Sequence, residues 1–248
     1  MGILNATPDS FFAGSRVQTE RAVCGRVEQI LREGGTMVDV GACSTRPGGC
    51  VATEQEETER LRMALGAIRS SFPEVIISVD TFRPNVAKMA IEEYEADIIN
   101  DVSGGGDAPA KGEREMFHVV ARSHVPYIFM SSKSNIHDML MEMAERVQQL
   151  RDLGQNDIII DPGFGFGKTL EENYQVLNRL DQLQALELPV LVGVSRKRMI
   201  HQSLGVSIEE ALNGTTVVNT IALMKGAAIL RVHDVKEAVE AVRIIHHL

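Results

Sequence analysis

Short apolar runs rich in β-branched residues alternate with longer amphipathic segments along the whole chain. Runs that are apolar throughout predict strands buried on both faces, as in a parallel sheet that is covered by helices. Eight segments have this pattern, and we expect a strand in each of them. They lie at 1–5, 37–41, 75–80, 97–101, 127–131, 157–161, 189–195 and 227–232.

The segments between these runs have the spacing of amphipathic helices. In the first, at 20–35, Val23, Val27 and Ile30 fall on one helical face, and a pair of glycines predicts the end of the helix. Strands that alternate with helices form βαβ units, and about 250 residues is the usual size of a closed barrel of eight such units. We therefore expect an α/β fold, a single (β/α)8 TIM barrel domain spanning 1–248. The other predicted helices lie at 53–70, 84–95, 114–124, 136–153, 171–184, 207–225 and 235–246.

Composition and charge exclude several classes of function. The chain has 34 acidic and 25 basic residues, a net charge of −9, which disfavours binding to nucleic acid or to an anionic membrane surface. It has no signal-peptide pattern and no apolar stretch of about 18 residues, so we expect neither secretion nor membrane insertion. Its three cysteines form no CxxC pair, which disfavours a disulfide framework or a thiolate zinc site and fits a cytoplasmic location.

Polar residues follow almost every predicted strand at its carboxyl end. In a TIM barrel these ends converge on one face, so we expect them to surround a single active site. One Asp or Asn after a strand is more often a helix cap or a turn residue, but the repetition of the pattern favours a functional role. The residues are Asn5, Ser44, Thr45, Arg46, Asp80, Asn100, Asp161, Ser195, Lys197, Arg231 and His233.

The carboxylates that end two apolar strands, Asp80 and Asp161, would be partly desolvated and would require hydrogen-bond donors. A flat heterocycle rich in N–H groups supplies such donors. The glycine-rich segment at 161–169 is not a phosphate loop, because Pro162 stands where that motif requires glycine. Two interpretations remain for it: a mobile loop, or a loop on which Phe164 and Phe166 form aromatic walls for a planar substrate.

Two later segments indicate an anion site. Residues 195–199 read SRKRM and follow an apolar run at the expected start of a helix, where backbone N–H groups bind anions. Asn5, Arg231 and His233 would form a pocket suited to a Mg²⁺-bound diphosphate, with the Asn5 amide oxygen as a metal ligand. The alternatives are that His233 is a surface cap and that Arg231 pairs with Asp234.

Seven motifs, in this order, resemble dihydropteroate synthase over practically the whole chain: MGILNATPDSF, DVGACSTRPGG, SVDT, DIINDVSG, DPGFGFGK, VGVSRK and RVHDV. The resemblance implies a TIM barrel, usually a homodimer, that joins p-aminobenzoate to 6-hydroxymethyl-7,8-dihydropterin diphosphate. The products would be 7,8-dihydropteroate and pyrophosphate. It further implies an SN1-like displacement in which Mg²⁺, Arg231 and His233 stabilise the departing pyrophosphate, while Asp80 stabilises the methylene cation.

The resemblance also assigns roles residue by residue. The pterin would be bound by Asp80, Asn100, Asp161, Phe166 and Lys197. The diphosphate would be bound by Asn5, Ser44, Arg231 and His233, with Asn5 contacting Mg²⁺. The p-aminobenzoate would be bound by Thr45, Arg46, Pro47, Ser195 and Arg196. The catalytic residues would be Asp80, Lys197, Arg231 and His233.

One departure from the family pattern follows the fifth predicted strand. Ser131 and Ser132 stand where the family commonly has a His and a Met that border the pterin pocket, which predicts a change in pterin affinity or in substrate choice. Two alternative functions are therefore kept. One is a pterin-binding methyltransferase domain of the corrinoid-dependent kind, which has no use for a diphosphate pocket. The other is a paralogue that binds pterin without turnover.

Overall fold

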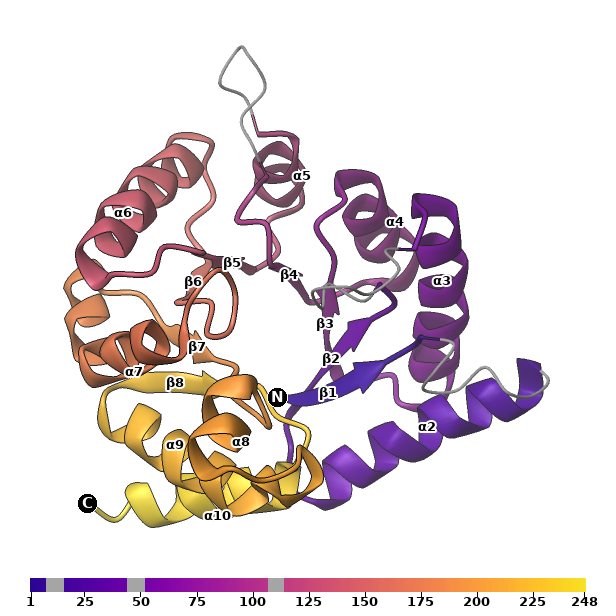
Figure 1. Cartoon of the computed structure of the whole chain (residues 1–248). Coiled ribbons are helices and arrows are strands. Elements are labelled where there is room, and N and C mark those ends of the chain that lie inside the picture. The colour runs from indigo at the N-terminus through magenta and orange to yellow at the C-terminus, as the bar shows by residue number, and fades with distance from the viewer. Residues whose placement is uncertain (8–15, 44–51, 107–113) are drawn as a thin grey trace. The chain divides into compact units, whose positions relative to one another are not determined.

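The computed structural model describes residues 1–7, 16–43, 52–106 and 114–248 (Figure 1). These residues form two compact units. The N-terminal unit is Gly2–Tyr127, and the C-terminal unit is Ile128–Leu248 together with Met1. The single domain expected over 1–248 stays a prediction.

The N-terminal unit is built from parallel strands that alternate with helices. Strands β1 to β4 pair in sequence order, and Figure 1 shows α2, α3 and α4 side by side along these strands. Val38, Val40, Ile77 and Val79 in β2 and β3 are fully buried, as continuous apolar strands require. The elements are β1 (Gly2–Asn5), α2 (Arg16–Arg32), β2 (Met37–Gly41), α3 (Glu54–Ser71), β3 (Ile76–Asp80), α4 (Pro84–Tyr94), β4 (Ile98–Asp101) and α5 (Glu115–Ser123).

The C-terminal unit repeats this alternation. Strands β6, β7 and β8 are parallel neighbours, with a register shift between Val190 and Leu191. The elements are β5 (Tyr127–Met130, whose first residue belongs to the N-terminal unit), α6 (Ile136–Asp152), β6 (Ile158–Asp161), α7 (Leu170–Asn178), η1 (Leu180–Leu186), β7 (Val190–Val192), α8 (Arg198–Leu204), η2 (Glu209–Ala211), α9 (Leu212–Met224), β8 (Ala227–Leu230) and α10 (Val235–Ile245).

Capping boxes fix the start of two helices that follow candidate functional loops. The Thr53 hydroxyl accepts from the Glu56 N–H at 3.2 Å, while the Glu56 carboxylate accepts from the Thr53 N–H at 2.8 Å. Thr169 and Glu172 make the same pair of bonds at the start of α7. Each box satisfies two backbone donors that the first turn of a helix leaves unpaired. The chain therefore enters α3 and α7 at defined residues.

The predicted fold class is confirmed, because the described residues contain eight strands, each followed by a helix. The run at 189–195 gives a shorter strand than predicted. β7 ends at Val192, after which the Lys197 N–H donates to the Val194 carbonyl and Arg196 adopts a left-handed φ of 55°. The helix predicted at 171–184 ends at Asn178, before the 3₁₀ helix η1, and the helix predicted at 207–225 begins at Leu212, after the 3₁₀ helix η2. None of the described helices is both long enough and apolar enough to cross a membrane.

Candidate active site

Parallel pairing places the ends of β1 to β4 at one level in the N-terminal unit. Asn5 is the register partner of Gly41, Gly41 of Asp80, and Asp80 of Asn100. Paired residues of parallel strands point to the same side of a sheet, and Gly41 contributes no side chain to this row. A Cβ at Gly41 would lie 3.5 Å from Asp80 Oδ2, so glycine leaves the space beside this carboxylate open.

Asp39 is a buried carboxylate that the sequence analysis did not identify. Its side chain is 0% exposed and accepts from Ser78 Oγ at 2.6 Å and from Asn100 Nδ2 at 3.3 and 3.2 Å. A carboxylate can only accept here, so it fixes which end of the Asn100 amide faces it. Asn100 Oδ1 is thereby left to accept from a ligand. The signal in the sequence was an acidic residue between Val38 and Val40, because a charge inside an apolar strand requires partners.

Asp161 ends β6 in the C-terminal unit and is surrounded by cations. Its half-buried carboxylate accepts from the Gly163 N–H at 2.7 Å. Burial raises the pKa of Asp161, and Lys197, the Gly163 N–H, Arg231 and Lys168 oppose this rise. A carboxylate in this setting is well suited to a ligand that presents N–H donors.

Lys197, the residue before α8, contacts the glycine-rich loop that follows Asp161. Its Nζ donates to the Phe164 carbonyl and lies 4.8 Å from the centre of the Phe166 ring. Phe164 is fully buried, so it belongs to the core and is not a wall for a substrate. Phe166 is half-buried and makes a cation–π contact with Lys197. Of the two phenylalanines in the aromatic-wall interpretation, only Phe166 is placed to serve it.

Ser195 and His233 lie together where β7 and β8 end. The His233 N–H donates to Ser195 Oγ at 3.2 Å, and the Arg231 N–H donates to the Val192 carbonyl at 2.9 Å. Asp234 forms an ion pair with Arg196 at 2.9 Å, and the alternative in which Arg231 pairs with Asp234 stays a prediction. The candidate anion-binding residues of the C-terminal unit are thus neighbours in space.

Arg196 is held within the C-terminal unit. Its Nε and Nη2 donate to the two Asp234 oxygens at 2.9 Å each, and Nη1 donates to the carbonyls of Ile208 and Glu209 at 3.0 and 2.6 Å. This guanidinium therefore braces the turn after β7 against η2 and the start of α10. Its assignment to the p-aminobenzoate site stays a prediction. The predicted residues Ser44, Thr45, Arg46 and Pro47 lie outside the described residues.

The residue expected to contact a metal, Asn5, is half-buried at the end of β1. Its side-chain amide makes no hydrogen bond to any described residue. Across the described ranges there is no group of three or more His, Cys, Asp or Glu side chains that could hold a metal ion. Protein-bound Mg²⁺ usually keeps several water ligands, binds substrate phosphates and takes only one or two ligands from the protein. The side-chain oxygen of Asn5 is therefore compatible with a Mg²⁺ site.

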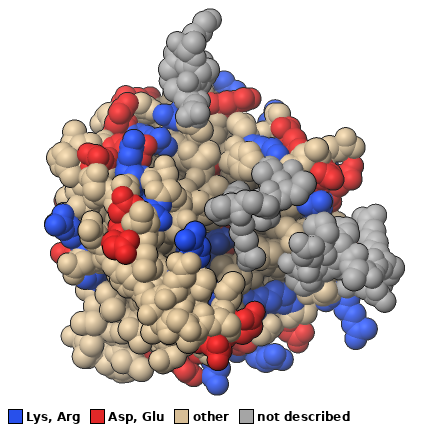
Figure 2. All heavy atoms as spheres, viewed as in Figure 1, with Lys and Arg blue, Asp and Glu red and all other residues tan. Residues whose placement is uncertain are grey.

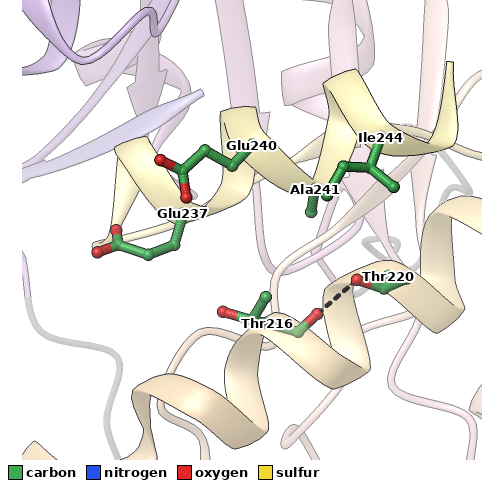
Figure 3. Close-up of a pocket in the computed structure, with 6 residues that line it drawn as sticks. All are labelled: Thr216, Thr220, Glu237, Glu240, Ala241 and Ile244. Carbon is green, nitrogen blue, oxygen red and sulfur yellow. Dashed lines mark hydrogen bonds between the residues drawn. The ribbon is translucent and has the colours of Figure 1, made fainter. Parts of the chain in front are cut away.

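A cavity of about 220 Å³ lies away from the strand ends, between α9 and α10. Figure 3 shows Thr216 and Thr220 of α9 opposite the α10 side chains, with the Thr220 hydroxyl donating to the Thr216 carbonyl at 2.8 Å. No predicted site residue lines this cavity, so it is not the candidate active site. Its lining residues are Thr216, Thr220, Glu237, Glu240, Ala241 and Ile244.

Comparisons with known proteins agree over almost the full chain. Residues 1–233 match the family described as pterin binding enzyme. The dihydropteroate synthase of Clostridium beijerinckii is 37% identical, covering 98% of this chain and 91% of its own. That of Escherichia coli is also 37% identical, over 99% of this chain and 89% of its own.

Solved structures give the same result. The dihydropteroate synthase of Clostridium difficile, crystallised in the presence of pteroic acid, matches with a TM-score of 0.91 and 30% identity, over 100% of this chain and 95% of that chain. The Xanthomonas albilineans enzyme with 4-aminobenzoic acid matches with a TM-score of 0.89 and 32% identity, over 100% and 91%. The chain therefore belongs to the pterin-binding enzymes of the (β/α)8 class. Within that class it is a dihydropteroate synthase, a transferase of folate biosynthesis, and neither alternative function is favoured.

The buried contact between Asp39 and Asn100 gives the first prediction. An Asp39→Asn substitution leaves a side chain that can both donate and accept, so the Asn100 amide is no longer held in one orientation. We expect the affinity for pteroic acid to fall by about 10- to 100-fold, the equivalent of about 1–3 kcal/mol for a disturbed buried hydrogen bond. Isothermal titration calorimetry measures this affinity, and a thermal melt verifies that the variant is folded. Unchanged affinity in a folded variant would show that Asp39 does not orient Asn100 for binding.

Proposed function

We propose the roles of the individual residues in the synthase reaction, in which p-aminobenzoate displaces pyrophosphate from 6-hydroxymethyl-7,8-dihydropterin diphosphate. The observation that carries the proposal is the cluster at the end of β6. There a half-buried carboxylate, an ammonium group and a half-buried aromatic ring lie together in Asp161, Lys197 and Phe166. This combination suits a flat, polar heterocycle, which needs acceptors for its N–H groups and a surface for its ring.

The N-terminal unit contributes acceptors of the same kind to the proposal. Asp80 and Asn100 are register partners, and Asp39 orients the Asn100 amide. We assign both residues to the pterin, with the Asp80 carboxylate also stabilising the methylene cation as positive charge develops. A fixed charge aimed at developing charge is commonly among the largest contributions to catalysis.

The proposed leaving-group site is cationic. Arg231 and His233 follow β8, and we assign their side chains to the diphosphate, whose charge grows as the methylene carbon–oxygen bond breaks. The p-aminobenzoate amine then forms a bond to that carbon and loses one proton. Ser195 beside His233 is assigned to the benzoate carboxylate, together with Arg196 and the residues at 45–47. The Yersinia pestis relative was solved with a sulfonamide drug, and we propose that sulfonamides compete at this site here also.

We propose Mg²⁺ as the cofactor, held by Asn5 together with the diphosphate and water. The position of Asn5 at the end of β1, with an amide that makes no hydrogen bond to the residues the structure describes, supports this assignment. When bound, the ion would neutralise charge on the departing pyrophosphate. A cytoplasmic location is proposed as well, supported by the free thiols of Cys24 and Cys43.

The reaction itself is tested by pyrophosphate release from the purified full chain in the presence of Mg²⁺. We expect release only when the pterin diphosphate and p-aminobenzoate are both present, because the second substrate traps the cation. Omitting each substrate in turn supplies the controls. Protein that binds the pterin but releases no pyrophosphate would instead be the paralogue without turnover.

The Asp161 assignment is tested with Asp161→Asn. The amide places an NH₂ donor where the proposal requires an acceptor for the ring N–H groups, so we expect the affinity for pteroic acid to fall by about 100-fold or more. Asp157→Asn is the matched control, since Asp157 is an exposed aspartate that precedes the other end of β6. Calorimetry on both variants decides the assignment, which fails if the two bind equally well.

We further propose that the chain forms a homodimer through α9 and α10. α9 contains no charged residue, yet Val217, Ile221 and Met224 on its outer face are 52%, 36% and 68% exposed. On α10, Ile244 is 65% exposed. Figure 2 shows that uncharged atoms predominate over the region where Figure 1 places α8 and α9. An uncharged helix face of this kind is typical of a self-complementary contact between identical subunits.

Ile221→Glu tests this interface. An unpaired carboxylate in an apolar contact is costly to desolvate, so we expect the dimer to dissociate into monomers. Size-exclusion chromatography with light scattering measures the mass in solution. Leu31→Glu on α2, where Leu31 is 37% exposed, is the matched control and should leave the mass unchanged. A dimer that persists in Ile221→Glu would place the interface elsewhere.

A further inference from the structure

Lys168 lies at the end of the glycine-rich loop, immediately before the residue that caps α7. Its half-buried ammonium donates to three backbone carbonyls: Gly163 at 3.0 Å, Phe166 at 3.2 Å and Ser131 at 3.3 Å. An ammonium group has three donors, so this geometry matches its full capacity. Lys168 therefore ties the loop after β6 to itself and to the loop after β5.

The loop that Lys168 closes contains three glycines in the left-handed region. Gly163, Gly165 and Gly167 have φ values of 65°, 80° and 60°, in the left-handed region that favours glycine. Glycine loses the most backbone entropy on ordering, so a loop with three of them needs contacts to hold one conformation. A Cβ at Gly163 would lie only 2.3 Å from the Ser131 carbonyl, which shows how closely the two loops pack.

Three carbonyl oxygens that converge on one point repel each other unless a cation lies between them. The charged groups facing Lys168 are Asp161 on β6, Glu142 on α6 and Glu172 on α7. Burial lowers the pKa of Lys168 to about 8, and these carboxylates oppose that shift. Burying an ammonium group costs desolvation free energy that an apolar side chain would avoid. The three hydrogen bonds to the carbonyls offset this cost.

The loop closed in this way carries two groups of the proposed pterin site. The Gly163 N–H donates to Asp161 Oδ1, and the Phe166 ring contacts Lys197. The carbonyls of the same two residues, Gly163 and Phe166, accept from Lys168. Displacing these carbonyls would displace the N–H that orients Asp161 and the ring beside Lys197.

We propose that Lys168 is a positioning residue for the pterin: it holds the loop after β6 in one conformation, so that the Asp161 carboxylate and the Phe166 ring are arranged before the substrate binds. This inference rests on the proposed assignment of Asp161 and Phe166 to the pterin. It predicts an effect on one substrate only, because preorganisation lowers the cost of binding the group that the loop contacts. The contact to Ser131 is made by backbone, so it does not depend on the side chain at that position.

The test compares Lys168→Met with Lys133→Met in the full chain. Lys133 lies on the loop after β5, is exposed, and belongs to no assigned site, so it is a matched control. In Lys168→Met we expect the KM for the pterin diphosphate to rise by about 10- to 100-fold, as for other small misplacements of a binding group. We expect the KM for p-aminobenzoate to stay within about twofold. Lys168→Arg, which keeps the charge and the donors, should recover part of the loss.

A residue that only stabilises the fold gives a different result: a lower melting temperature and less active protein, with both KM values unchanged. That result, or an equal pterin KM in Lys168→Met and Lys133→Met, would overturn the proposal. If Lys168→Met does not fold, Lys168→Gln is compared with the same control under the same criterion. If the wild-type chain releases no pyrophosphate, the affinity of the same variants for pteroic acid is measured by calorimetry. This tests the positioning role of Lys168 separately from the synthase reaction. Equal affinities there would overturn that role.

Discussion

Parallel pairing in register is the constraint on which the candidate site of the N-terminal unit depends. The row that runs from Asn5 through Gly41 and Asp80 to Asn100 exists because each strand is hydrogen-bonded to the next at the same level. A shift of one residue in any strand would turn its terminal polar side chain to the opposite face. The buried Val and Ile residues of these strands resist such a shift, since it would move them out of the positions in which they are packed. The core thereby fixes the position of groups that contribute nothing to it.

Buried polar side chains hold other site residues and the loop backbone in fixed positions relative to the strands. Asp39 holds Asn100, and the fully buried Glu57 on α3 pairs with Arg83, whose other terminal nitrogen donates to the Ala52 carbonyl. In the C-terminal unit Lys168 acts in the same way, because its ammonium holds the backbone of the loop after β6. A buried charge is unfavourable until it is paired, and it then restricts its neighbours to the few geometries that keep it paired. In this chain that restriction acts on residues that flank the proposed ligand-binding groups.

The sequence predicted the strands closely, because apolar runs buried on both faces leave an unambiguous pattern. It predicted helix ends less well: a 3₁₀ helix replaces the end of the helix predicted at 171–184 and another replaces the start of the one predicted at 207–225. Strand-end residues such as Asp80 and Asp161 were found because their position alone marks them. Asp39, Lys168 and the ion pair of Arg196 with Asp234 were missed, since they depend on which oxygen lies within about 3 Å of a donor, as hydrogen bonding requires. The full burial of Phe164 and the partial burial of Phe166 depend on the backbone path of the loop, which local sequence does not specify.

Ser131 stands where the family commonly has a His, and its contacts show which of its atoms support the loop after β6. The Ser131 hydroxyl donates to Glu142 on α6, a carboxylate that also accepts from Arg146 at 2.7 Å. The hydroxyl is therefore engaged with the helix, and its backbone carbonyl is the group that contacts Lys168. Since position 131 contributes only its backbone carbonyl to that contact, a His or a Ser there can support the same loop. Of the altered residues after β5, the exposed Ser132 is thus expected to change the surface offered to the pterin, while the support beneath Asp161 is retained.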